Sequence, residues 1–156
     1  MKKLFVCLAL ILAAAAASAA TLSATITEVA GKVEYKLPGR DWKPAKVGDV
    51  VPSGTVISTG FKSTALLTVG PSTITVKPVT RLTLEELVES SSGTQTQLFL
   101  LAGRVKADVT PQSGKVTEFK VKSPTATASV RGTGFEFDGV NLIVDRGLVE
   151  LRTPSG

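Results

Sequence analysis

The chain has 156 residues, of which 18 are lysine or arginine, 13 are aspartate or glutamate, one is cysteine and none is histidine, and its formal net charge is +5. Without histidine the chain has no histidine general base and no histidine-ligated metal, and a single cysteine forms neither an internal disulfide nor a four-thiolate zinc site. The length fits one domain. We therefore expect a non-enzymatic protein with no catalytic residue, no metal and no cofactor.

The first nineteen residues have the pattern of a cleavable secretory signal. Residues 1–3 carry positive charge, residues 4–16 are apolar and uncharged, and residues 17–19 are the small side chains that a signal peptidase reads. The alternative, a membrane-spanning helix, needs about 20 apolar residues, more than this run contains. We expect cleavage after Ala19 or one residue later, a periplasmic or secreted protein, and no stable membrane span once the leader is removed.

Residues 20–156 are the expected mature chain. Its formal net charge is +3, since Lys2 and Lys3 are lost, and it has no cysteine, because Cys7 lies near the start of the apolar run. Its stability in an oxidising compartment must come from a packed core rather than from disulfides. Positive residues do not cluster and aromatic residues make up only 5% of the chain, so we expect no nucleic-acid binding.

From residue 22 to residue 153 the pattern is that of short β-strands separated by turns. Threonine and valine are frequent, and both favour strands. Turn signals occur at Pro38-Gly39 and at Gly70-Pro71. The clearest period of two runs from Ile74 to Leu84, where the even positions are mostly apolar and the odd positions mostly polar. Pro78 interrupts this run and predicts an edge or a break between two strands.

Residues 82–89 fit a short helix or a strand. We favour a strand that turns at 90–93 and returns as residues 97–102. The alternation then predicts the following apolar face for the returning strand and the next one: Phe99, Leu101, Val105, Ala107 and Val109.

Towards the C-terminus, Phe119 and Val121 alternate with lysines, and Phe135 and Phe137 flank a glutamate. Asp138-Gly139 is a two-residue hairpin signal that pairs residues 135–137 with residues 140–144. Frequent turns between short alternating runs are typical of all-β domains. The sequence therefore predicts one all-β domain at 20–156, with short, mostly antiparallel strands that form a rolled sheet or a β-sandwich.

A weak internal repeat is centred on three glycines. Residues 29–34, 101–106 and 145–150 each contain an extended stretch, a glycine, one further residue, then valine and a charge. The glycines are Gly31, Gly103 and Gly147. Glycine within a strand marks a bulge, a bend or a close backbone approach. The repeat predicts three strands that are bent by glycine.

Three stretches of the sequence resemble the FecR domain, the periplasmic module of iron-dicitrate sensor proteins. The first comprises Gly31-Lys32-Val33, Trp42-Lys43-Pro44 and Gly48-Asp49. The second is residues 54–60 followed by residues 63–67, and the third is residues 119–124 followed by residues 130–135. The order and spacing of these stretches, rather than any single motif, carry the resemblance.

The resemblance implies an exported, non-catalytic module that contacts another envelope component. A full sensor of that family also has a cytoplasmic anti-sigma segment and a transmembrane helix. We expect this chain to consist of a leader and the FecR-like part only, and therefore to make no direct contact with a sigma factor. The residues that match the family pattern are expected to be structural: Gly31, Gly48, Gly54, Thr59, Gly60, Gly103, Gly132, Thr133, Phe135 and Gly147.

Two residues are candidate partner contacts. Arg131 precedes Gly132-Thr133-Gly134, which fits either an anion-binding loop or, as we favour, a tight strand crossing that needs glycine. Trp42, the single tryptophan, fits either packing or a contact with a sugar or peptide.

Among the acidic residues, Glu85 and Glu86 would point to opposite faces of a strand and so make poor catalytic partners. We interpret Asp138 as turn chemistry rather than as a calcium ligand.

The sequence therefore leaves several functional hypotheses open. The leading hypothesis is a protein-interaction or sensing module in the cell envelope, whose bare sheet edges can pair with a partner strand. The second is a cell-wall polysaccharide or peptidoglycan binder, motivated by Trp42. A further alternative is a component of an iron-dicitrate-type signalling system without the cytoplasmic part.

Overall fold

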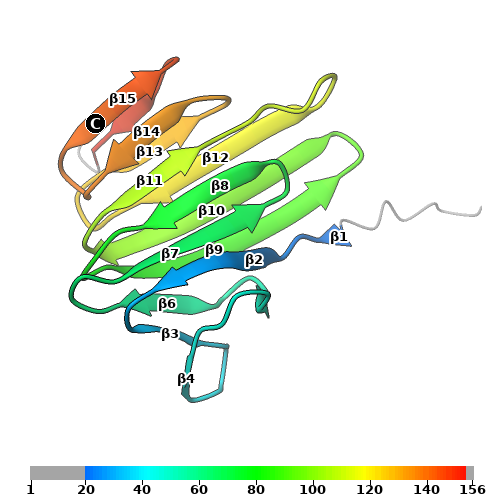
Figure 1. Cartoon of the computed structure of the whole chain (residues 1–156). Coiled ribbons are helices and arrows are strands. Elements are labelled where there is room, and N and C mark those ends of the chain that lie inside the picture. The colour runs from blue at the N-terminus through cyan, green and yellow to red at the C-terminus, as the bar shows by residue number, and fades with distance from the viewer. Residues whose placement is uncertain (1–19, 154–156) are drawn as a thin grey trace, which may run out of the picture.

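Two stacked β-sheets make up the protein (Figure 1). The computed structural model describes residues 20–153, which contain sixteen strands and no helix. The expected leader, residues 1–19, lies outside the described residues. The all-β prediction is confirmed, and of the two architectures that the sequence left open the structure is the sandwich, without closure into a barrel.

Sheet A has nine strands, in the order β16 (Glu150–Arg152), β13 (Thr127–Val130), β12 (Val116–Lys122), β10 (Gly93–Ala102), β9 (Arg81–Ser90), β6 (Val56–Thr59), β3 (Val33–Lys36) and β4 (Trp42–Pro44), with β1 (Ala20–Thr21) beside β9. Sheet B has seven, in the order β15 (Leu142–Arg146), β14 (Gly134–Phe137), β11 (Val105–Asp108), β8 (Ser72–Val76), β7 (Thr64–Val69), β2 (Ala24–Ala30) and β5 (Val50–Val51). Within residues 20–153 the pairings are antiparallel except for the parallel pair β10–β12.

The core lies between the two sheets and is made of the inward-facing side chains of both. Phe119 of sheet A meets Phe135 of sheet B edge to face, with ring centroids 6.2 Å apart and ring planes at 77°. Such a pair contributes about 0.5–1.5 kcal/mol beyond the area that it buries. The described part of the chain leaves no buried side-chain nitrogen or oxygen without a hydrogen-bond partner. The polar side chains that the core encloses are therefore satisfied by hydrogen bonds within the protein.

The period of two between residues 74 and 84 is confirmed. Ile74, Val76, Leu82 and Leu84 are all buried in the core. Pro78 lies in the break between β8 and β9. Residues 82–89 belong to β9, which turns and returns as β10, and the hairpin at Asp138-Gly139 joins β14 to β15. Both strand predictions are therefore confirmed.

The predicted register of β10 was wrong. Leu98 and Leu100 face the core, whereas Phe99 is half-buried on the outer face and Leu101 is exposed. Residues 98–101 are four consecutive apolar side chains, so alternation within them does not define a face. Thr96 shows which face of β10 is turned to the core, because its buried side chain lies on the same face as Leu98.

The chain changes sheet at each glycine of the internal repeat, where the strand ends instead of bending as predicted. At each of these corners the glycine lies against a buried hydroxyl residue on a second, antiparallel crossing: Gly31 against Ser63, Gly103 against Thr80, and Gly147 against Thr133. The strands that meet there are β2–β3 with β6–β7, β10–β11 with β8–β9, and β15–β16 with β13–β14. The sandwich is thus three antiparallel ribbons folded over at three glycine–hydroxyl corners.

The second corner illustrates how close the two crossings come. A Cβ atom on Gly103 would lie 2.3 Å from the Thr80 hydroxyl and 2.6 Å from the carbonyl oxygen of Val79. The Thr80 hydroxyl accepts the Arg104 N–H at 2.9 Å and donates to the carbonyl of Arg104 at 3.2 Å or of Pro78 at 3.3 Å. Glycine leaves the space, and the hydroxyl satisfies the backbone groups that neither sheet pairs.

The two ends of the sandwich differ. Residues 45–49 form an arch from β4 in sheet A to β5 in sheet B, and they are hydrogen-bonded to both sheets through Ala45 N to Val33 O at 2.9 Å and Gly48 N to Ile26 O at 2.8 Å. This is the capped end. At the other end, which carries β15 in Figure 1, the edge strands are β15 and β16, joined by residues 147–149. We call it the open end.

The corner geometry predicts unequal effects of two alanine substitutions. Gly103 and Gly48 have almost the same φ, +90° and +91°, but a Cβ on Gly48 meets nothing within 4 Å. Gly48→Ala should cost about 1 kcal/mol from backbone strain alone. Gly103→Ala should cost about 3 kcal/mol or more, because the new methyl group overlaps backbone atoms. Urea unfolding of the two variants measures the difference, and equal losses would contradict the role given to the corner.

Candidate partner-binding surface

A groove crosses the outer face of sheet A near the open end, and we call it the outer groove. It has a volume of about 860 Å³. Strands β10, β12, β13 and β16 contribute to it, together with the residues that follow β13 and flank β16. Ten of its twelve lining residues are polar or charged: Gln97, Glu118, Lys120, Lys122, Thr127, Ser129, Arg131, Glu150, Arg152 and Thr153, beside Val130 and Leu148.

The charged side chains of the outer groove are mostly paired. Glu150 and Arg152 form an ion pair at 2.6 Å, Lys120 pairs with Glu118, and Lys122 lies 3.8 Å from a glutamate on β9. Within residues 20–153, no carboxylate lies within ion-pair distance of Arg131. The lining has four cations, and Arg131 is the one of them without a carboxylate partner among residues 20–153. This arrangement favours a polar partner that brings at least one carboxylate of its own.

A β-bulge in β9 places two carboxylates beside the groove, contrary to the prediction that Glu85 and Glu86 point to opposite faces. The register shifts between Gln97 and Leu98, so that Glu85 is the extra residue of the bulge. The side-chain amide of Gln95 donates to Glu86 at 3.4 Å, and that of Gln97 donates to Glu85 at 2.8 Å. A bulge cancels strict alternation, which is why the sequence pattern gave the wrong face.

The structure does not bring the two candidate contact residues together. Trp42 lies on β4 at the capped end, whereas Arg131 follows β13 near the open end, and five strands of sheet A separate β4 from β13. Trp42 is 40% exposed, and the Arg81 guanidinium lies over its ring, 5.6 Å from the centroid. Arg131 lines the outer groove, and Trp42 does not.

Several family-pattern residues lie in turns and at the first corner. Gly48 belongs to the arch at the capped end, and the Gly54 N–H donates to the carbonyl of Leu84 at 2.6 Å. The Gly60 N–H donates to the carbonyl of Lys32 beside Gly31 at 2.8 Å. The buried Thr59 hydroxyl donates to the carbonyl of Lys77 at 2.6 Å and so ties the first ribbon to the second.

The loop that contains Arg131 is a crossing from sheet A to sheet B. A Cβ on Gly132 would lie 3.0 Å from the ring of Pro111, and Phe135 is buried in the core. The Thr133 hydroxyl donates to the carbonyl of Leu148 at 3.0 Å, across the third corner from Gly147. The backbone on either side of Arg131 is therefore fixed, and its side chain is presented from a rigid position.

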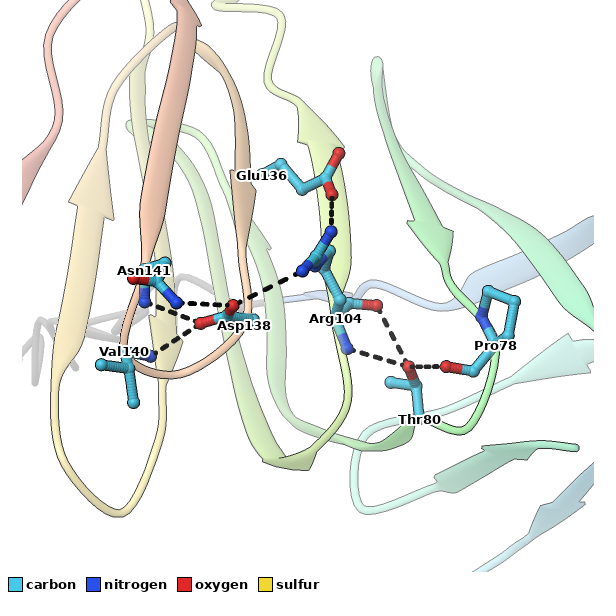
Figure 2. A network of polar contacts seen from close by, with 7 residues as sticks. All are labelled: Pro78, Thr80, Arg104, Glu136, Asp138, Val140 and Asn141. Atoms are coloured by element: carbon cyan, nitrogen blue, oxygen red, sulfur yellow. Dashed lines mark hydrogen bonds and ion pairs between the residues drawn. The ribbon is translucent and has the colours of Figure 1, made fainter. Parts of the chain in front are cut away.

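A second polar cluster, which the sequence patterns did not single out, surrounds Arg104 on the outer side of sheet B (Figure 2). The Arg104 guanidinium lies 3.1 Å from Glu136 and 3.6 Å from Asp138, in a hollow of about 420 Å³. The sequence signal that could have pointed to Arg104 is its position directly after Gly103, a glycine of the internal repeat. Arg104 links the second corner to the hairpin of the third ribbon, so the cluster is accounted for by the fold.

Asp138 organises that hairpin, which confirms its interpretation as turn chemistry. Its carboxylate accepts the N–H groups of Asn141 at 2.7 Å and Val140 at 3.0 Å, and the side-chain amide of Asn141 at 3.0 Å. The side-chain and backbone hydrogen bonds from Asn141, followed by that from Val140, lower the pKa of Asp138 to about 2. No group of three Asp, Glu, Cys or His side chains in residues 20–153 is placed to hold a metal ion.

The lowered pKa predicts how stability depends on pH. A carboxyl group with a pKa near 2 in the folded state and about 3.9 in the unfolded state stabilises the fold above pH 4, and this contribution is lost as the pH falls towards 2. Asp138→Asn should therefore cost about 1 kcal/mol at neutral pH, after allowance for solvent, and nothing near pH 2. Denaturant unfolding between pH 2 and pH 7 measures this, with Asp41→Asn as an exposed control. A cost that stays constant with pH would contradict it.

Comparison with known proteins agrees with the resemblance noted in the sequence. The family model described as FecR protein matches residues 55–150, more than half of the chain. The match contains the second and third corners and most of the outer groove, but not Gly31, Trp42 or the arch at the capped end. No curated protein and no solved structure matches the chain. Residues 20–153 contain no helix of the length and apolar character needed to cross a membrane.

FecR proteins form a signalling-related family of the cell envelope. A match over residues 55–150, in an all-β sandwich whose corners carry the glycines of the family pattern, places the chain in it. The protein belongs to the FecR family.

Proposed function

We propose that this FecR protein works by binding rather than by catalysis, as an interaction or sensing module of the cell envelope. The outer groove is the proposed contact surface, and an extended or loop segment of another envelope protein is the proposed partner. The observation that carries the proposal is the Arg131 side chain, which stands in the groove on a rigid crossing and has no carboxylate partner within residues 20–153.

The composition of the groove supports recognition of a polypeptide. Its amide, hydroxyl and charged side chains offer hydrogen bonds to backbone and polar groups, and Leu148 supplies an apolar contact at one end. Arg131 can form a bidentate pair with a carboxylate of the partner. The neighbouring carboxylates, Glu85 and Glu86, are engaged by glutamine amides, an arrangement that supports a binding surface rather than an acid–base pair.

The cell-wall glycan hypothesis loses its main support, because it was motivated by Trp42. None of the described residues that line the outer groove is aromatic, and the Trp42 ring lies at the capped end beneath Arg81. Sugar rings are commonly held by stacking on aromatic faces, which this groove does not provide. Participation in iron-dicitrate-type signalling is a narrower form of the same proposal, and identification of the partner would decide it.

The test is cross-linked affinity capture from the protein's own cell envelope, read by mass spectrometry. Wild type should recover a specific envelope protein, and Arg131→Ala should recover it at least about fivefold less well, as expected for loss of an interface arginine. Trp42→Ala should recover it normally, because Trp42 is remote from the groove.

Arg40→Ala is the matched control, since Arg40 is an exposed arginine in the turn between β3 and β4. Unchanged melting temperatures would show that each variant is folded. Sedimentation of the protein with insoluble cell wall, without a captured protein, would overturn the proposal in favour of the glycan hypothesis. Equal losses of the captured protein with Arg131→Ala and Arg40→Ala would show that the outer groove is not the contact surface.

A further inference from the structure

The open end exposes side chains that belong to the interior of the sandwich. Val144 on β15 lies opposite the buried Phe135, and Leu151 on β16 lies opposite the buried Ala128, so both face inwards. They are nevertheless 40% and 43% exposed, because no further strand covers them within residues 20–153. Inward-facing apolar side chains with this exposure indicate a core that continues into a partner.

Leu148 adds a fixed apolar contact at the same end. It lies in the link between β15 and β16 and is 85% exposed. Its carbonyl oxygen accepts the Thr133 hydroxyl at 3.0 Å, which holds the backbone of the link in place. A large apolar side chain on a restrained backbone loses little entropy on binding, so Leu148 is suited to insert into an apolar surface.

The capped end has no surface equivalent to that of the open end. The arch of residues 45–49 runs from sheet A to sheet B at that end, and it is hydrogen-bonded to both of them. Head-to-tail addition, which would extend both sheets into a filament, would have to place the open end against this arch. A symmetric pair, in which a second copy contacts the open end through its own open end, needs no such fit.

The sequence of β16 is complementary to itself in an antiparallel pair. Its three residues are Glu150, Leu151 and Arg152. With a two-fold axis at Leu151, each Glu150 lies opposite the partner's Arg152, and the two leucines meet on the core face. Opposite charges directly across an antiparallel pair are stabilising, and like charges are destabilising.

We propose that the open end is an interface between two copies of this chain. The two-fold axis runs perpendicular to the sheets, β16 pairs with β16 of the second copy, and Val144, Leu148 and Leu151 of both copies complete one shared core. Leu148, Glu150 and Arg152 also line the outer groove. Pairing therefore joins the two grooves across the axis, with the Glu150 and Arg152 pairs at the centre.

The first measurement is the mass of the exported full-length protein by multi-angle light scattering and sedimentation equilibrium at tens of micromolar. Two copies per particle are expected, with dissociation on dilution. Leu151→Lys should abolish association, since it places a charge on the core face at the axis. Leu151→Ala, which adds no charge to the strand, should also weaken association, but less than Leu151→Lys does.

A charge-reversal experiment tests the antiparallel register. Glu150→Arg and Arg152→Glu should each weaken self-association by about tenfold, because like charges then meet across the axis. An equimolar mixture of the two variants should associate again as a mixed pair, with opposite charges restored between chains. The ion pair within each chain is lost in both variants, so recovery on mixing reports only contacts between chains. Glu34→Arg breaks the Lys32–Glu34 pair, at 3.4 Å between β3 and the residue that precedes it, and is the matched control with no expected effect.

The outcomes separate this inference from the proposed function. A monomer at all concentrations would overturn the inference. A dimer insensitive to Leu151→Lys and to charge reversal would also overturn it. If an unrelated protein is cross-linked at Leu148 of a monomeric chain, the inference of a second copy is wrong, and the proposed function as an interaction module still holds. A dimer that captures no envelope protein would instead count against the proposed function alone.

Discussion

The close passage of two antiparallel strands at each glycine–hydroxyl corner is the constraint on which the sandwich depends. A chain that leaves one sheet for the other gives up the ladder hydrogen bonds of both, so its backbone groups need other partners. Ser63, Thr80 and Thr133 supply them from buried positions: Ser63 accepts the Lys32 N–H at 2.8 Å, and Thr80 and Thr133 bind Arg104 and Leu148. This works only if the hydroxyl can approach the opposite backbone, and the glycine makes that approach available.

The corners also determine which side chains reach the surface and from where. Arg104 follows the second corner glycine and bridges to the hairpin held by Asp138. Arg131 and Leu148 lie beside the two residues of the third corner, one in the outer groove and the other shared between the groove and the open end. Side chains next to a rigid corner lose little freedom when they bind, which favours such positions for recognition. The residues with structural roles and the candidate contact residues are therefore neighbours in sequence.

The sequence was informative where a local rule acts alone, and misleading where distant segments decide. Alternation identified Ile74 and Leu84 as core residues, and the Asp-Gly turn identified the hairpin of β14 and β15, because both signals lie within a few residues. It failed at Phe99, inside an unbroken apolar run, and at Glu85, where a bulge shifts the register. The repeat of Gly31, Gly103 and Gly147 was visible, but its meaning required the hydroxyl partners from other crossings. Nothing local indicates that five strands of sheet A lie between Trp42 and the strand that precedes Arg131.

The two ends of the sandwich then have different relations to the family. The arch and Trp42 lie outside the residues that match the FecR model, whereas Arg131, Leu148 and most of the outer groove lie inside them. At the capped end the arch joins the edge strands β4 and β5 of the two sheets, and both are short, as edge strands are in many β-proteins. The open end has only a short strand and a bulge for protection, and it leaves interior side chains in water. The proposed contact residues Arg131, Val144 and Leu148 therefore lie within the residues that the family match includes, whereas Leu151 lies just beyond them.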